Sequence, residues 1–272
     1  MTTSATRRWL LVVVALGVLA SGASAQSVPP AARSELAPTG KLRAGLILSN
    51  QVLVTKDPQT GEVRGVTVAL GKALAQRLGV PFEPVGYPDP AALVQSFGRN
   101  EWDIAFLAFD PTRAREVDFS PAYMVVDNTY LVPTGSRVQT VEMADRSGVK
   151  IAVPERSAPD LFLSRTLKAA EIIRVPGGAE AAIEVLRSGR ADAYAENAHM
   201  LSLYSDRLPG SRVLDGRYTL IQHAVATPDG KVAAADYIKQ FVEESKRDGT
   251  IRDAITQAGL RRTVAADPLP AK

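Results

Sequence analysis

Alternation of short apolar runs with amphipathic helical segments is the feature that most constrains the fold of this chain. Between Lys41 and Phe109 the pattern predicts a strand, a helix, a strand, a helix and a strand in turn. The clearest helix covers Val66 to Leu78, where apolar residues recur at helical spacing and Gly79 follows as a suitable C-cap. This alternation favours a mostly parallel sheet covered by helices.

The same order of elements begins again after Pro133. We expect strands at 147–154, 172–176 and 191–196, helices at 158–170, 179–187 and 197–204, a long strand at 218–227, and helices at 232–247 and 251–258. Extended segments at Asn128 to Pro133 and Tyr218 to Ala226 bracket this second unit. A chain that crosses twice in this way joins two lobes by two hinge strands.

The expected fold class is therefore α/β, with two lobes. Each lobe has a mixed or parallel sheet with helices on both faces. Lobe 1 is predicted to comprise 40–130 and 221–262, and lobe 2 to comprise 131–220.

The N-terminus has the features of an export signal. Arg7 and Arg8 precede an apolar run of 12 residues from Trp9 to Ala20, and Ala23-Ser24-Ala25 fits an A-x-A cleavage site. A helix that spans a membrane needs about 20 apolar residues, so a cleaved signal is favoured over an uncleaved anchor. We predict a signal peptide at 1–25, a flexible leader at 26–39 and a flexible tail at 263–272.

Composition narrows the possible chemistry. The chain has no cysteine, which excludes disulfides, thiol nucleophiles, cysteine-bound metals and a lipid-bearing cysteine. Without residues 1–25 it has 30 basic and 29 acidic residues, so no nucleic-acid partner is expected. We expect a secreted protein that is not lipid-anchored and is a monomer.

Motifs of known enzyme classes are missing. The sequence has no G-x-S-x-G elbow, phosphate-binding loop, dinucleotide fingerprint or H-E-x-x-H motif. His199 and His223 are the only histidines, and neither has a second metal ligand at helical spacing. No catalytic residue, metal site or cofactor is expected.

Each lobe has groups suited to anions beyond the end of a strand. In the first lobe, the strand that ends at Phe109 leads into Asp110-Pro111-Thr112-Arg113. Arg113 could bind a carboxylate through two parallel hydrogen bonds, or it could be a surface partner of Glu116.

In the second lobe, Glu155, Arg156 and Ser157 follow a strand, and Ser157-Ala158-Pro159-Asp160 fits an S-x-x-D cap. Ser157 could donate to an anion at this helix N-terminus, or it could be a plain N-cap. The presence of anion-binding groups at equivalent ends of both lobes favours a ligand in the cleft between them.

Two long segments resemble a known family. They are "GEVRGVTVALGKALAQRLG" (Gly61 to Gly79) and "DPTRAREVDFSPAY" (Asp110 to Tyr123), supported by "GRADAYAEN" (Gly189 to Asn197) and a late "DGT". The likeness extends over roughly Gly40 to Leu260, and the sequence is similar to the polar-amino-acid family of bacterial periplasmic solute-binding proteins. The resemblance implies a two-lobed periplasmic-binding-protein fold that closes on a small ligand and delivers it to an ABC-type membrane permease.

The resemblance also implies roles for particular residues. The carboxylate-binding arginine falls on Arg113 and the small hydroxyl position on Ser157. The acidic residue that receives an α-ammonium falls on Asn197, with Glu196 just before it. Because an amide has no charge, Glu196 takes this role, Asp110 takes it, or the ligand lacks the amine.

The family's first aromatic position falls near Asn50, and a second falls near Pro90 with Tyr87 as its substitute. The predicted ligand-binding set is Asn50, Tyr87, Phe109, Asp110, Arg113, Arg156, Ser157, Glu196 and Asn197.

The expected function is capture of an amino acid or related small carboxylate for ABC-type import. One alternative is a dehydratase-like enzyme on the same scaffold, acting on a small carboxylate, with Glu196 or His199 as acid or base. A ligand-sensing module that reports to a membrane receptor is the other.

Overall fold

The computed structural model describes residues 28–270. The predicted signal peptide and its cleavage after Ala25 lie outside the described residues. Within the described range, no helix combines the length and apolar character needed to cross a bilayer.

Three parallel strands form the core of the first group of elements. β1 (Leu42–Ile47) lies between β4 (Phe82–Tyr87) and β5 (Ile104–Ala108). Helices α2 (Val66–Leu78) and α3 (Pro90–Gln95) connect these strands, and β2 (Thr55–Lys56) and β3 (Val63–Arg64) form a small hairpin before α2. The predicted cap of α2 is present, because Gly79 adopts a left-handed φ of 66°.

The second group repeats this arrangement. Strands β8 (Lys150–Pro154), β9 (Glu171–Val175) and β10 (Ala193–Asn197) are parallel, with β8 in the middle. Helices α4 (Ala158–Thr166), α5 (Ala179–Arg187) and α6 (Ala198–Ser205) accompany them. The side chain of Asn197 caps α6 and that of Ser157 caps α4.

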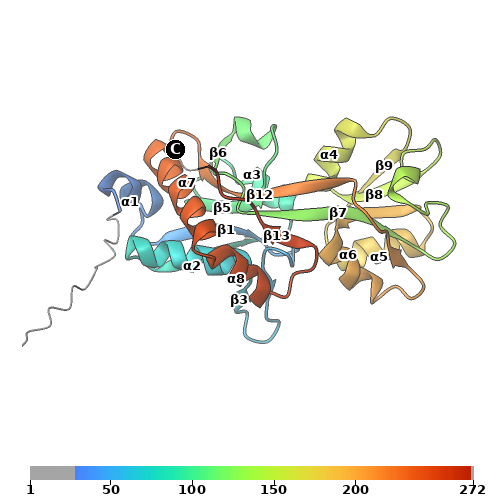
Figure 1. The fold of residues 1–272 in the computed structure, drawn as a ribbon, viewed down its shortest axis with the longest axis horizontal. Helices are drawn as coiled ribbons and strands as arrows, with labels where there is room; N and C mark the ends of the chain where they lie inside the picture. Colours follow the sequence, from blue (N-terminus) through green and yellow to red (C-terminus); the bar gives the residue numbers. More distant parts are fainter. Residues whose placement is uncertain (1–27, 271–272) are drawn as a thin grey trace, which may run out of the picture.

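Two long antiparallel strands join the groups. β7 (Met124–Val132) and β12 (Thr219–Pro228) run between the two groups, as Figure 1 shows. β7 pairs with β10 of the second group, and β12 pairs with β5 of the first. The two expected sheets are therefore continuous: within the described residues they form one sheet with the order β4-β1-β5-β12-β7-β10-β8-β9.

Shorter elements complete the two groups. β6 (Val117–Phe119) pairs with β12, and β11 (Arg212–Val213) pairs with β7. Short 3-10 helices occur at Arg113–Arg115 and Val141–Met143. α7 (Val232–Arg247) and α8 (Thr250–Gln257) return to the first group.

The segment expected to be a flexible leader contains a helix. In α1 (Pro30–Leu36), Ala32 and Leu36 are buried and the helix packs on α7. Glu35 accepts a hydrogen bond of 2.8 Å from the backbone of Ala234. The prediction was wrong for this stretch because one helical turn places two apolar residues on α7, a contact that no local periodicity reveals.

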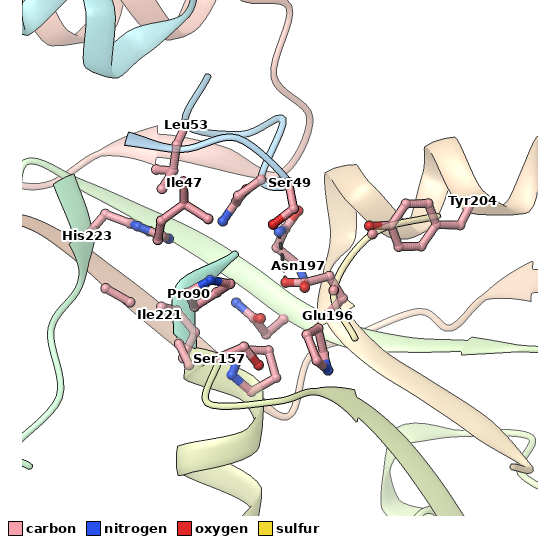
Figure 2. Close-up of a pocket in the computed structure, with 18 of the residues that line it drawn as sticks. Ile47, Ser49, Leu53, Pro90, Ser157, Glu196, Asn197, Tyr204, Ile221 and His223 are labelled. Carbon is pink, nitrogen blue, oxygen red and sulfur yellow. Dashed lines mark hydrogen bonds between the residues drawn. The ribbon is translucent and has the colours of Figure 1, made fainter. Parts of the chain in front are cut away.

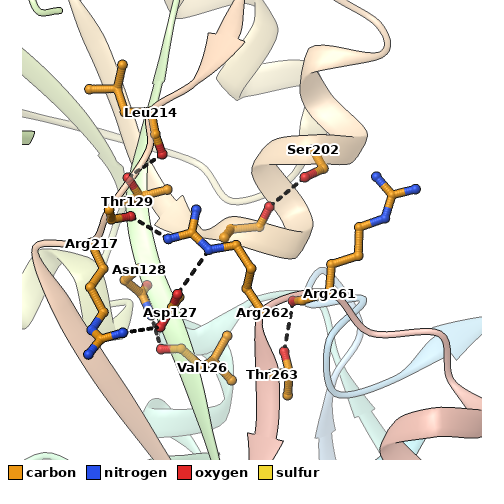
Figure 3. A network of polar contacts seen from close by, with 12 residues as sticks. Val126, Asp127, Asn128, Thr129, Ser202, Leu214, Arg217, Arg261, Arg262 and Thr263 are labelled. Atoms are coloured by element: carbon orange, nitrogen blue, oxygen red, sulfur yellow. Dashed lines mark hydrogen bonds and ion pairs between the residues drawn. The ribbon is translucent and has the colours of Figure 1, made fainter. Parts of the chain in front are cut away.

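The expected flexible tail also has ordered structure. β13 (Thr263–Ala265) pairs with β7, and the side chain of Glu243 accepts a 2.7 Å bond from the backbone of Leu269. Just before β13, Arg262 pairs with Asp127 of β7 at 3.0 Å, and Arg217 reaches the same carboxylate at 3.3 Å (Figure 3). A strand of three residues is too short to show an alternating pattern, and its order here comes from pairing with a strand that lies far away in sequence.

Candidate functional site

A cavity lies where the two groups of elements face each other across β7 and β12. The carboxyl ends of β1, β5, β8 and β10 all meet there, as Figure 2 shows in part. Its volume is about 40 Å³, which is room for only a few water molecules. Ligands of open parallel sheets bind outside the carboxyl ends of strands, so the cavity has the position expected for a binding site.

Arg113 lies at this cavity and is only 4% exposed. Nη1 donates to the carbonyl of Ala108 at 2.9 Å, and Nη2 donates to the carbonyl of Arg156 at 2.7 Å. Nε is buried without a partner, and no carboxylate within residues 28–270 forms an ion pair with this guanidinium. The surface pair with Glu116 is therefore not formed.

Burial lowers the pKa of Arg113 to about 10, and the charge of Asp110 opposes this shift. Arg113 thus stays charged at neutral pH while buried. A buried guanidinium without an anion is costly unless an anion from outside completes the site.

The turn before α4 supplies the other side of this subsite. Arg156 adopts a left-handed φ of 56°, and its backbone N–H donates to Asp160 at 2.9 Å. This backbone conformation is unusual for a residue other than glycine, and it turns the Arg156 carbonyl toward Arg113. Ser157 is buried, lines the cavity and accepts a 3.3 Å bond from the backbone of Asp160. It is thus an N-cap that also faces the cavity.

Glu196 lies at the end of β10 and lines the cavity with Asn197 (Figure 2). Its Oε1 accepts bonds from the backbone N and the Nδ2 of Asn197, at 2.9 and 3.0 Å. No basic side chain of the described residues pairs with Glu196. Burial raises its pKa to about 7, against the lowering effect of the two bonds from Asn197.

Both polar atoms of the Asn197 side chain have a partner within the chain. Its Oδ1 accepts the backbone N–H of Met200 at 2.9 Å, which caps α6, while its Nδ2 binds Glu196. Within the described residues, Glu196 is consequently the acidic side chain that lines the cavity.

The remaining candidates divide into one that lines the cavity and four whose side chains do not. Asn50 lines it, and its side chain accepts from the backbone of Val52 at 3.1 Å. Tyr87 points elsewhere, since its hydroxyl donates to Glu101 at 2.7 Å. Phe109 is 43% exposed and packs edge-on against Phe119.

Asp110 turns back to accept from the backbone of Thr112 at 2.8 Å and pairs with Arg165 of α4 at 2.8 Å. These contacts explain why its carboxylate lies outside the cavity. Arg156 contacts Arg113 through its backbone carbonyl, while the residue itself is exposed.

Several cavity residues were absent from the predicted set. They include Ser49, Asn128, Tyr204 and His223. Tyr204 follows Asn197 by seven residues on one helix face, a spacing that could have revealed it. His223 and Ile221 are two residues apart on β12, so they lie on the same face of the strand, and both line the cavity.

His223 is 5% exposed, and its Nδ1 has no partner among the described residues. Burial and the positive charge of Arg113 lower its pKa to about 3. The imidazole is therefore neutral at physiological pH. His199 does not line the cavity and accepts a 3.3 Å bond from the backbone of Arg261.

Comparison with known proteins gives a family for this fold and site. Residues 49–258 match the model of the bacterial extracellular solute-binding proteins, family 3. The chain belongs to this family. The expected resemblance is confirmed, and the protein is a solute-binding protein with the two-lobed α/β fold of that family.

Similar curated proteins include the ABC transporter glutamine-binding protein GlnH of Bacillus subtilis (strain 168). It is 23% identical over 214 residues, which cover 77% of each chain. The glutamine-binding protein of Geobacillus stearothermophilus is 23% identical over 184 residues, 66% of this chain and 70% of the relative.

Solved structures with the same fold include the ancestral amino acid-binding protein AncCDT-1, described as a precursor of cyclohexadienyl dehydratase. It has a TM-score of 0.70 and 25% identity, and the match covers 83% of this chain and 97% of the other. The P235GK mutant of ArgBP from T. maritima has a TM-score of 0.71 and 22% identity, over 84% and 99% of the two chains.

Proposed function

We propose that this solute-binding protein captures an α-amino acid as a zwitterion in the cavity between its lobes and delivers it to an ABC-type permease. The observation that carries the proposal is an unpaired cationic group and an unpaired acidic group in one cavity, Arg113 buried and Glu196 partly buried. Arg113 and Glu196 line one cavity, and neither has an ionic partner among the described residues. The carboxylate and ammonium of an amino acid would complete both.

The carboxylate end of the ligand is assigned to Arg113 and Ser157. A guanidinium has five N–H donors, and two of them are used by the carbonyls of Ala108 and Arg156. Nε is buried and unpaired, and the N–H groups that remain could hold a carboxylate through two bonds. The N-terminus of α4, nine residues long, adds its dipole beside Ser157.

The ammonium end is assigned to Glu196. Of the three possibilities left open by the sequence, Asp110 is disfavoured because it lies outside the cavity and is neutralised by Arg165. Asn197 is occupied by its cap and by Glu196. The hydrogen bonds from Asn197 orient the Glu196 carboxylate, and a ligand ammonium would lower its raised pKa and keep it ionised.

Closure of the lobes is assigned to hinge motion in β7 and β12, at Asn128–Pro133 and Tyr218–Ala226. Two contacts join the groups directly beside the cavity: Arg113 with the carbonyl of Arg156, and Asp110 with Arg165. Because the cavity has room for only a few water molecules in this arrangement, the groups must move apart to admit an amino acid. A ligand held by both groups then favours the closed arrangement and shifts the population toward it. Boundaries at 40–130 with 221–262 and at 131–220 fit the placement of these strands.

The names of similar proteins support the amino-acid assignment and the transporter partner. Two are called glutamine-binding proteins, and a solved neighbour is described as a solute receptor for L-cysteine of Neisseria gonorrhoeae. Export to the periplasm with removal of residues 1–25, and a monomeric protein without a lipid anchor, belong to the same proposal.

A dehydratase-like activity is the second candidate function. Its support is the raised pKa of Glu196, about 7, which suits a general acid, and the described descent of cyclohexadienyl dehydratase from AncCDT-1. We favour binding, because Glu196 has a sufficient role as a partner for ammonium.

Ligand identification tests the proposal directly. Mass spectrometry of small molecules released from the purified protein, followed by calorimetric titration with the twenty amino acids, is expected to give at least one that binds with 1:1 stoichiometry. If only carboxylates without an amine bind, the Glu196 assignment is wrong. A bound cyclic carboxylate that is released as a dehydrated product would favour the enzyme.

A further inference from the structure

The cavity has a charge inventory that limits its ligand further. Among the residues that line it, Arg113 and Glu196 are the charged side chains, and His223 is neutral. The α-carboxylate and α-ammonium of an amino acid use both charges. A charged ligand side chain would be buried without a counter-ion, which is unfavourable.

Besides Arg113, His223 lines the cavity and has a side-chain nitrogen without a partner among the described residues. The Nδ1 atom of His223 is buried and unpaired, and the ring is held on β12 where its backbone pairs with that of Ala108. Figure 2 shows His223 on the opposite side of the cavity from Glu196, near Ile47. The surroundings of His223 therefore differ from those of the ammonium site.

We propose that the ligand is an amino acid with an uncharged polar side chain, and that His223 is the specificity-determining residue that recognises this side chain by hydrogen bonding. The proposal rests on the amino-acid function proposed above. A neutral imidazole has one N–H donor and one acceptor nitrogen. A hydroxyl or a carboxamide also has both a donor and an acceptor, so either can form a hydrogen bond with the ring. An apolar side chain would offer no hydrogen-bond partner to the ring of His223 at the cavity, and a site built for a hydrogen bond discriminates against ligands that lack it.

Calorimetric titration of the mature protein with matched pairs tests this assignment. The pairs are threonine with valine, and asparagine with leucine. Of threonine and asparagine, we expect the one with the higher affinity to bind at least about tenfold more tightly than the apolar amino acid of its pair. Arginine, lysine, aspartate and glutamate should bind at least about 100-fold more weakly than that ligand.

His223→Leu supplies the variant, and His199→Leu is the matched control because His199 lies outside the cavity. In His223→Leu, the preference for the polar member of the pair should fall below about threefold, while the apolar member binds about as in the wild type. His199→Leu should keep the full preference. Circular dichroism checks that each variant is folded.

A second measurement does not depend on the variants. The ¹⁵N chemical shifts of the His223 ring should change on binding of the polar ligand and not on binding of its apolar partner.

The outcomes separate the two proposals. If no amino acid binds, the proposed function fails. If an amino acid binds but the tightest ligand is charged, or the polar and apolar partners bind equally to the wild type, the inference about the side chain is overturned while the function stands. Equal weakening of all amino acids in His223→Leu would assign His223 to the carboxylate instead.

Discussion

Replacement of Arg113 by alanine is the perturbation whose effect the structure specifies best. Arg113 is 4% exposed and its guanidinium has no anionic partner within the described residues, so a ligand carboxylate would supply its missing counter-charge. Truncating one member of a buried, hydrogen-bonded charge pair costs about 2–5 kcal/mol. Arg113→Ala should therefore weaken binding by roughly 30-fold to several thousandfold.

Effects on folding should be small by comparison. The variant leaves the carbonyls of Ala108 and Arg156 without their bonds to Arg113, which is unfavourable. It also removes a buried charge whose pKa is lowered by desolvation, which is favourable. Because these effects oppose each other, we expect the melting temperature of the empty protein to change by only a few degrees.

Calorimetry with the identified ligand, combined with thermal melts of the empty proteins, gives the test. Arg113→Lys should recover only part of the affinity, because a single ammonium cannot form the paired bonds of a guanidinium. Arg115→Ala is the matched control, since Arg115 lies in the same 3-10 helix but is exposed. Near-normal affinity in Arg113→Ala with a folded protein would refute the assignment of the carboxylate site.

Four further predictions concern Glu196, Arg165 and helix α1. The pKa of Glu196 is about 7 in the empty site, and a ligand ammonium requires the ionised form. Affinity should therefore rise about tenfold per pH unit from pH 5 toward 7 and then level off. Calorimetry at several pH values should show this rise, and Glu196→Gln should remove it. Because of the same raised pKa, the empty protein should lose the contribution of Glu196 to its stability as pH rises through 7. Thermal melts of the wild type and of Glu196→Gln at several pH values would detect this loss. Melting temperatures that change with pH in the same way in both proteins would contradict it. Arg165→Ala removes a half-exposed ion pair between the two groups of elements. It should enlarge the radius of gyration of the empty protein in small-angle scattering and weaken binding by no more than about fivefold. An unchanged scattering profile would show that this ion pair does not hold the groups together. Leu36→Ala creates a cavity under α1 and should reduce the free energy of unfolding by about 2–4 kcal/mol in urea titrations, a loss that a flexible leader would not show.

Regular elements of this chain were predictable from local patterns. The helices at Val66–Leu78, Ala179–Arg187 and Val232–Arg247 have the expected bounds, because each has an apolar face of several turns. Arg113 and Ser157 could be predicted as cavity residues because they follow strands whose carboxyl ends face one another.

The misassigned residues depend on contacts that local patterns do not encode. Asp110 follows the same strand as Arg113, yet its side chain turns toward Thr112 and Arg165 and leaves the cavity. His223 lies on a strand between the groups, and its role depends on which face of β12 meets the cavity. Helix α1 and strand β13 are ordered by partners that are distant in sequence, so short-range periodicity could not reveal them.

In the proposed function the cavity binds both ends of a zwitterion, with Arg113 at the carboxylate and Glu196 at the ammonium. The most direct test is a calorimetric comparison of the identified amino acid with its α-carboxamide and its deamino analogue, each of which lacks one of the two charges. We expect both analogues to bind at least about 30-fold more weakly than the amino acid, because each loses the charge pair at one end of the cavity. Binding of either analogue with the affinity of the amino acid would contradict the claim for the corresponding end of the ligand.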